Sequence, residues 1–158
     1  MRIVLQRVNR AAVRVDGEVV GDIGKGLLAL VGVERGDGAD EVARAAQRLV
    51  ELRIFEDDAG RMNHDVTGAG GAVLVVSQFT LAADLSRGRR PSFGAAAPPE
   101  LAEPLVARLV EDLRARGVGV ATGRFGARME VELINAGPVT FVLEIVPTGS
   151  APQSTAGA

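Results

Sequence analysis

The sequence contains no cysteine, tryptophan or tyrosine, and His64 is the only histidine among its 158 residues. Without cysteine the chain forms no disulfide, no thiolate zinc site and no cysteine nucleophile. Histidine-rich metal sites are excluded too, and a catalytic triad would depend on His64 alone. Every basic residue except Lys25 is arginine, so a lysine Schiff base has one candidate. Few of the side chains that usually carry catalysis are present.

Long hydrophobic runs and an excess of charge of one sign are also absent. The longest apolar run, residues 26–33, is far shorter than the roughly 20 residues that a membrane helix needs. Arg2, Arg7 and Arg10 interrupt the first apolar segment, which is therefore unlike a signal peptide. The net charge is −2. These observations predict a cytoplasmic protein of single-domain size without bulk attraction to nucleic acid or to membranes.

The charge is unevenly distributed along the chain. Residues 86–128 contain eight arginines and four acidic residues, and Arg87, Arg89 and Arg90 lie within four residues of one another. Two interpretations of this cluster are open. It is either a solvated loop with incidental charge or a small patch that contacts phosphates.

Alternating apolar residues and turn residues predict a sheet that is mostly antiparallel. Asp16-Gly17 favours a type I′ hairpin turn between two strand-like runs. Residues 27–33 are apolar on both faces, which is typical of a strand covered on both sides. Strands are expected over residues 2–8, 12–15, 18–23, 27–33 and 72–76, and near 118–122, 129–135 and 139–146.

Apolar residues at helical spacing predict two helices. One follows the capping residues 37–40, repeats apolar residues from Val42 to Val50 and ends near Arg53. The second lies within residues 99–116 and carries a stripe of leucines at positions 101, 105, 109 and 113. Pro104 either delays its start or kinks its first turn. The predicted fold class is α+β, with a single domain over residues 1–146 in which two helices cover a mostly antiparallel, barrel-like sheet. Residues 147–158 are predicted to form a disordered tail.

Three stretches contain residues suited to an active site. Residues 77–80, Ser-Gln-Phe-Thr, follow an apolar strand and offer hydroxyls, although such residues also form ordinary turns. Residues 135–140, Asn-Ala-Gly-Pro-Val-Thr, either connect two strands or form a rigid backbone segment with a cis proline. His64 is a weaker candidate because its neighbours supply no Ser-His-Asp spacing. Composition alone does not decide these alternatives.

Six motifs together resemble the D-aminoacyl-tRNA deacylase family. They occur in the order and spacing of that family over about residues 1–146. The motifs are Gln6-Arg7-Val8, Gly24-Lys25-Gly26-Leu27-Leu28, Ser77-Gln78-Phe79-Thr80-Leu81, Arg90-Pro91-Ser92-Phe93, Thr122-Gly123-Arg124-Phe125 and Asn135-Ala136-Gly137-Pro138-Val139-Thr140.

The resemblance implies a hydrolase, without metal or cofactor, that cleaves the ester bond of D-aminoacyl-tRNA and of misacylated glycyl-tRNA. It implies a homodimer that binds the acceptor end of tRNA at two interfacial sites, with no DNA or membrane partner. Gly137-Pro138 would be a cis wedge that enters the partner's pocket and rejects L-aminoacyl-tRNA, and Arg7 would hold it. The residues that line the pocket would be Ser77, Gln78, Phe79 and Thr80. Phe125 and Met129 would hold the terminal adenosine of the tRNA.

The scarcity of catalytic side chains favours a route in which water attacks the ester and the 2′-hydroxyl of the RNA assists. Backbone N–H groups near Phe79 and Thr80 would stabilise the oxyanion. Thr80 as a covalent nucleophile is an alternative, although no adjacent base is evident. Two other functions are a binding module that keeps the fold without catalysis, and a small-molecule esterase that uses Thr80 or Ser77.

Overall fold

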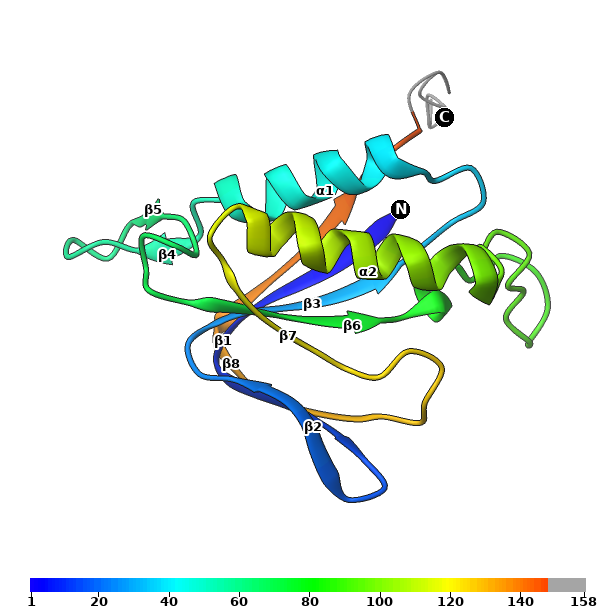
Figure 1. The fold of residues 1–158 in the computed structure, drawn as a ribbon, viewed down its shortest axis with the longest axis horizontal. Helices are drawn as coiled ribbons and strands as arrows, with labels where there is room; N and C mark the ends of the chain where they lie inside the picture. The colour runs from blue at the N-terminus through cyan, green and yellow to red at the C-terminus, as the bar shows by residue number, and fades with distance from the viewer. Residues whose placement is uncertain (148–158) are drawn as a thin grey trace.

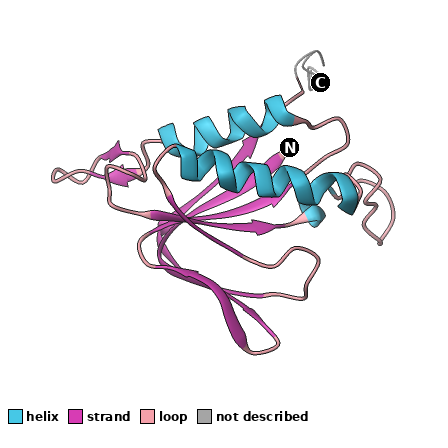
Figure 2. Ribbon diagram, viewed as in Figure 1, coloured by secondary structure: helices cyan, strands magenta, loops and turns pink. Residues whose placement is uncertain are grey.

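A mixed β-sheet forms the centre of the computed structural model, which describes residues 1–147 (Figures 1 and 2). The strands follow the order β2-β1-β3-β6-β7, and β8 pairs with the free side of β1. Their bounds are β1 (Arg2–Val15), β2 (Glu18–Ile23), β3 (Gly26–Gly32), β6 (Ala72–Ser77), β7 (Gly119–Thr122) and β8 (Glu130–Glu144).

The sheet curves into a nearly closed barrel because β1 changes partners along its length. Up to Val8 it pairs with β3, and from Ala11 onward it pairs with β2. This turn brings β2 close to β7 at the opposite edge. A Cβ atom on Gly21 of β2 would lie 2.2 Å from the carbonyl oxygen of Thr122, so only glycine permits this approach.

Both helices lie on one face of the sheet, as Figure 2 shows. β3 and β6 are parallel, as are β6 and β7, and a parallel pair requires a crossover connection. The helices α1 (Ala39–Glu51) and α2 (Pro99–Ala115) supply these two crossovers and pack against each other. The prediction of an α+β domain with two covering helices is confirmed.

The core has two parts, one on each face of β3. Leu27 points into the layer between the sheet and the helices, where Leu49 of α1 and Leu109 of α2 are fully buried. Its neighbour Leu28 points to the other face and packs with Leu74 inside the barrel. The prediction that residues 27–33 form a strand covered on both faces is therefore confirmed.

Several predicted boundaries differ from the structure. Residues 2–8 and 12–15 belong to one strand, because β8 pairs with β1 on both sides of the register shifts near Val8. Likewise, residues 129–135 and 139–146 largely form one strand interrupted by a bulge opposite Arg7. The strand predicted over residues 72–76 differs by one residue only: β6 ends at Ser77, and the chain then turns into the 3₁₀ helix η1 (Phe79–Ala82).

The second helix begins at Pro99, where a missing N–H is harmless, and contains Pro104. Its buried face is formed by Ala102, Leu109, Val110 and Leu113. The predicted stripe is wrong at Leu101, which is 59% exposed, because Ala102 occupies the inward position in the first turn.

No helix within residues 1–147 is long and apolar enough to cross a membrane. The predicted disordered tail lies outside the described residues apart from Pro147.

Candidate active site

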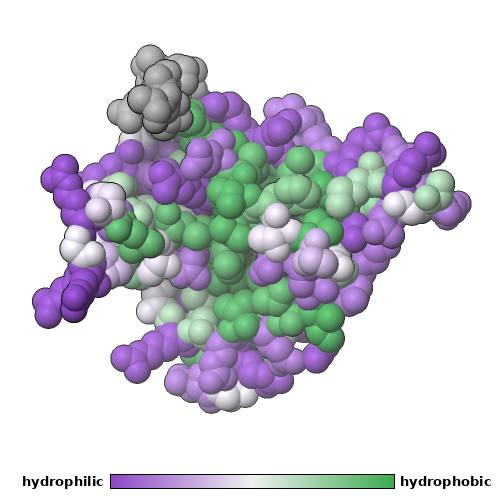
Figure 3. Space-filling model, turned by 180° about the vertical axis from the view of Figure 1, so that it is seen from behind, coloured by the Kyte–Doolittle hydropathy of each residue, from purple (hydrophilic) through white to green (hydrophobic). Residues whose placement is uncertain are grey.

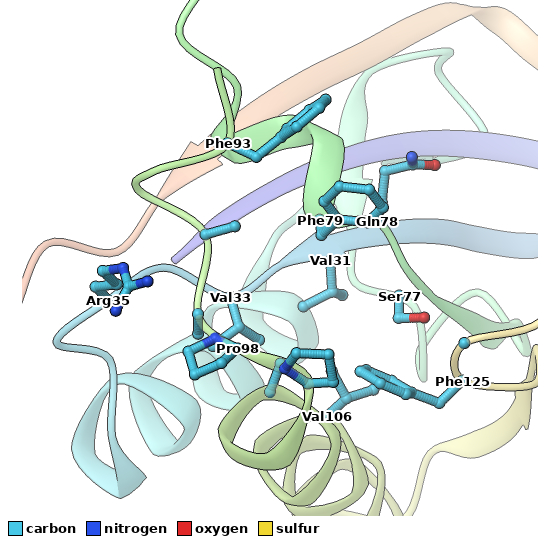
Figure 4. A pocket seen from close by; sticks show the side chains of 15 residues that line it. Val31, Val33, Arg35, Ser77, Gln78, Phe79, Phe93, Pro98, Val106 and Phe125 are labelled. Atoms are coloured by element: carbon cyan, nitrogen blue, oxygen red, sulfur yellow. The ribbon is translucent and has the colours of Figure 1, made fainter. Parts of the chain in front are cut away.

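A pocket of about 450 Å³ opens between the end of β6, η1 and the first turns of α2 (Figure 4). Most of its walls are apolar, and they include Val31, Val33, Phe93, Pro98 and Val106. Among the described residues no carboxylate and no imidazole lines it. Arg35 is the one charged side chain among the described lining residues, so the pocket suits a largely apolar group that is neutral or negatively charged.

Four of the predicted site residues line this pocket: Ser77, Gln78, Phe79 and Phe125. Met129 lines an adjoining pocket of about 240 Å³ that also contacts Ser77, Gln78 and Phe79. The strand end, η1 and the loop before β8 therefore bring five predicted residues into one region.

Thr80, the remaining predicted pocket residue, is exposed and lies one position beyond Phe79 in η1. Its hydroxyl accepts a hydrogen bond of 2.5 Å from the side-chain amide of Gln78. Figure 4 shows this amide turned away from Ser77. No histidine, lysine or carboxylate within residues 1–147 hydrogen-bonds the Thr80 hydroxyl, so this part of the chain places no base to activate it.

The start of η1 leaves backbone donors free beside the pocket. The Gln78 N–H donates to the Val31 carbonyl at 2.7 Å, which fixes the end of β6 against β3. The first donor into η1 is the Leu81 N–H, which binds the Gln78 carbonyl at 3.2 Å. No group within residues 1–147 accepts from the N–H of Phe79 or Thr80. These two N–H groups are available to a bound ligand.

Two aromatic rings stand at the mouth of the pocket. Phe79 is 57% exposed and Phe93 is 40% exposed. Their ring centroids lie 5.0 Å apart with an interplanar angle of 63°, an edge-to-face contact. Exposed rings that support each other in this way offer a surface for stacking a flat group such as a nucleobase.

A second cluster surrounds the Gly137–Pro138 segment of β8, whose peptide bond is cis and whose residues are exposed. Residues 136–139 form the bulge and take no part in the β1–β8 register. The buried Arg7 side chain donates from Nε to the Ala136 carbonyl at 2.8 Å. Its other nitrogens reach the Ile54 carbonyl at 2.8 Å and a Glu56 carboxylate oxygen at 3.0 Å. Arg7 thus connects this segment to the loop after α1.

Asn135 holds the same segment from its other side. Its side-chain oxygen accepts from the Val139 N–H at 2.8 Å, and its side-chain nitrogen donates to the Val139 carbonyl at 3.0 Å. Sequence reasoning treated Asn135 only as a residue favoured in connections. The signal that could have identified it is its position at the start of a bend, where an asparagine amide replaces a backbone partner.

The two clusters do not meet within one chain. Ser77 is paired with Val31, and Val31 with Ile3, across two strand spacings. Arg7, beside the Gly137–Pro138 segment, lies four residues from Ile3 along β1, a further distance of about 13 Å. The predicted pocket residues and the Gly137–Pro138 segment therefore occupy separate regions of the chain.

His64 lies far from the pocket. It belongs to β5 (Met62–His64), which pairs with β4 (Phe55–Glu56) at the opposite end of the molecule from η1 (Figure 1). Within residues 1–147 no group of three or more histidine, aspartate or glutamate side chains is placed to hold a metal ion.

Comparisons with solved structures agree with this fold. A structure described as "c-Myc DNA Unwinding Element Binding Protein" superposes with a TM-score of 0.86 and 38% identity, covering 91% of this chain and 98% of the other. A second, described as a probable eukaryotic D-amino acid tRNA deacylase, has a TM-score of 0.76 and covers 90% of this chain and 97% of that one. At 20% identity the second likeness shows the fold alone.

Sequence comparisons extend over nearly the whole described region. A D-aminoacyl-tRNA deacylase from Beutenbergia cavernae is 60% identical over 145 residues, which is 91% of this chain and 99% of the relative. Another, from Syntrophotalea carbinolica, is 56% identical over 144 residues, 91% of this chain and 97% of the relative. The family model described as D-Tyr-tRNA(Tyr) deacylase matches residues 4–144. The chain therefore belongs to the D-Tyr-tRNA deacylase family.

Proposed function

We propose that this protein hydrolyses the ester bond of D-aminoacyl-tRNA and of misacylated glycyl-tRNA, and rejects L-aminoacyl-tRNA. The observation that carries the proposal is the exposed Gly137–Pro138 segment, held by Arg7 and Asn135. The relatives at 55–60% identity are named D-aminoacyl-tRNA deacylase, which supports the same activity here.

The active site is composed of parts from two subunits of a homodimer. The separation of the pocket from the Gly137–Pro138 segment within one chain supports this arrangement. Exposed apolar side chains on the same strand, Ile134, Phe141 and Val142, also support it. The face opposite to that of Figure 1 has a hydrophobic area at its centre, of the kind that a second copy covers (Figure 3).

Chirality is selected by steric exclusion. The Gly137 and Pro138 carbonyls belong to a bulge outside the β-ladder, where they can accept from the α-amino group of the substrate. With the amino group and ester fixed, exchange of D for L swaps the side chain with the α-hydrogen. A D side chain then projects toward solvent, an L side chain collides with backbone, and glycine fits. The free-energy penalty of a clash between an L side chain and the backbone exceeds the roughly 1–3 kcal/mol of discrimination that one favourable methylene contact supplies.

The reaction depends on water, backbone donors and the substrate itself. The terminal adenosine binds in the pocket against Phe125 and Met129, and the ester carbonyl lies at the start of η1. The free N–H groups of Phe79 and Thr80 stabilise the negative charge that develops on its oxygen. A water molecule attacks, and the 2′-hydroxyl of the ribose assists the proton transfer. Ser77 and Gln78 position the substrate.

Thr80→Ala is expected to lower kcat by less than about tenfold, whereas loss of a covalent nucleophile costs on the order of 10⁶-fold. The reason is that the Thr80 hydroxyl is bound to the Gln78 amide, and no base within residues 1–147 hydrogen-bonds it. Single-turnover hydrolysis of D-Tyr-tRNA measures the effect. An acyl ester trapped on Thr80 and identified by mass spectrometry would reverse this assignment.

The proposed setting is the cytoplasm, where aminoacyl-tRNA is used, and the proposed partner is RNA. The related structure named for a DNA unwinding element suggests DNA as another partner for this fold. A pocket suited to one terminal nucleoside, with a bulge suited to an amino acid, favours aminoacylated RNA.

The test compares D-Tyr-tRNA with L-Tyr-tRNA at equal concentration in the presence of EDTA. The D-ester and glycyl-tRNA are expected to be hydrolysed, and the L-ester is expected to decay at its background rate. Comparable rates for the D- and L-esters would refute the proposed function. Activity abolished by EDTA and restored by a divalent ion would refute the metal-free route alone.

A further inference from the structure

Two exposed loops at the mouth of the pocket carry arginines that form no ion pair within residues 1–147. Residues 83–98, between η1 and α2, carry Arg87, Arg89 and Arg90, and the loop before β8 carries Arg124 and Arg128. By contrast, Arg108 and Arg114 on α2 are paired with Asp112 and Glu111. Apart from Arg35, which lines the pocket and also forms no ion pair within residues 1–147, the unneutralised positive charge of this region lies in the two loops.

The longer loop is fixed to the edge of the pocket. Asp84 and Ser92 exchange two backbone hydrogen bonds, of 2.8 and 3.0 Å, which close its base. The three arginines lie beyond this base, around Gly88, which has a φ of +70°. Just after the base, the Phe93 ring packs on Phe79 at the pocket mouth. Figure 1 shows this green loop projecting beyond the start of α2.

Two further charged residues lie at the base of this loop: Arg35, which contacts it, and Asp84, which belongs to it. Arg35, which lines the pocket, donates from Nε to the Gly94 carbonyl at 2.8 Å and so holds the returning chain. Asp84 is the only acidic residue of the loop. Hydrogen bonds from the Ser86 hydroxyl and N–H lower the pKa of Asp84, whose charge remains at the base and forms no ion pair with the arginines.

In the shorter loop, residues that line the pockets alternate with exposed arginines. Phe125, Ala127 and Met129 are partly buried and line the two pockets, whereas Arg124 and Arg128 are exposed between and beside them. The same segment thus presents one side to the bound nucleoside and arginines to solvent.

We propose that Arg87, Arg89 and Arg90, with Arg124 and Arg128 across the mouth, bind the phosphodiester backbone of the tRNA acceptor strand where it leaves the pocket. This inference rests on the proposed function, because an RNA whose last nucleoside fills the pocket must continue past these loops. Guanidinium groups suit phosphate oxygens, and unpaired ones need not break an ion pair to bind them. With a net charge of −2 the chain as a whole does not attract RNA. The local attraction comes from these five arginines, which we call the rim.

The experiment measures kcat/KM against KCl concentration for the triple variant R87Q/R89Q/R90Q. It uses D-Tyr-tRNA and the small ester 3′-O-D-tyrosyl-adenosine, which has no phosphate. Removal of three contacts to a single strand is expected to reduce the salt slope for tRNA by about 2. At 0.1 M salt the triple variant is expected to show a kcat/KM for tRNA that is lower by about tenfold or more, through a higher KM. This loss is expected to exceed its loss of kcat/KM for the small ester by at least about tenfold.

Arg116→Gln is the matched control for a single Arg89→Gln change. Arg116 is also exposed and without an ion pair within residues 1–147, but it caps the far end of α2, about 25 Å from the start of that helix. The control is expected to keep the wild-type salt slope, whereas Arg89→Gln is expected to reduce it by roughly 0.7.

Two outcomes overturn the proposal: a triple variant that follows the wild-type salt dependence with tRNA, or one that loses equally on both esters. Binding of fluorescent, non-acylated tRNA by anisotropy separates this inference from the proposed function. If neither ester is hydrolysed but RNA binding weakens in the triple variant, the function fails and the rim stands.

Discussion

Gly137→Ala is expected to reduce hydrolysis of D-Tyr-tRNA by about a hundredfold or more while the protein remains folded. A Cβ atom on residue 137 would lie 2.1 Å from the Val139 nitrogen and 2.7 Å from its Cγ2 atom. Both distances are far below contact, so the bulge must change shape. The displaced carbonyls no longer meet the amino group of the substrate, and a misplacement of about 1 Å is enough for a loss of this size.

Gly24→Ala is the matched control, because nothing lies within 4 Å of a Cβ atom at that position. It tests the same chemical change at the turn between β2 and β3, where the added methyl group meets no neighbouring atom. Steady-state kinetics and thermal unfolding of both variants measure the difference. Wild-type kinetics for Gly137→Ala would show that the shape of this segment does not determine activity.

Arg7→Lys is expected to lower the free energy of unfolding by about 2–4 kcal/mol and to raise the ratio of L- to D-ester hydrolysis. Arg7 is 9% exposed and donates to two carbonyls and a carboxylate in three directions. An ammonium group keeps the charge but lacks the planar fork that reaches all three acceptors. The Ala136 carbonyl then loses its donor, and the Gly137–Pro138 segment gains freedom to move away from an L side chain.

Arg10→Lys, on the same strand, is the control for this substitution. Its side chain is 60% exposed and pairs with Glu132 at 2.9 Å, so the change is expected to cost roughly 0.5 kcal/mol or less. Urea denaturation and the two ester assays provide the measurements. If Arg7→Lys destabilised the protein but left the chiral ratio unchanged, Arg7 would be a structural residue only.

Local patterns predicted the elements of this fold better than their boundaries. The hairpin at Asp16-Gly17 and the strand covered on both faces depend on neighbouring residues, and both occur in the structure. The length of β1 could not be predicted, because it depends on pairing with β8 more than one hundred residues away. Leu101 was placed on the wrong face because the inward position of the first turn belongs to Ala102.

In the site, too, sequence motifs identified individual residues but not the contacts between segments that are distant in sequence. The resemblance selected Phe125 and Met129, and the structure brings both to the pockets that Ser77 lines. The bonds from Arg7 to Ile54 and Ala136 join three segments that are distant in sequence, so no local pattern reveals them. The resemblance predicts that Arg7 holds the Gly137–Pro138 segment, and the structure shows a hydrogen bond from Arg7 to the neighbouring Ala136 carbonyl.

The measurement that tests the two-subunit site most directly is complementation between two inactive variants. Gly137→Ala leaves the pocket intact, whereas Ala96→Trp leaves the Gly137–Pro138 segment intact and fills the pocket that Ala96 lines. Coexpressed in equal amounts, the two chains are expected to recover about a quarter of the wild-type activity on D-Tyr-tRNA, because half of the dimers are mixed and each mixed dimer has one intact site. If coexpression restores no activity although mixed dimers form, each chain contains a complete site and the account is wrong.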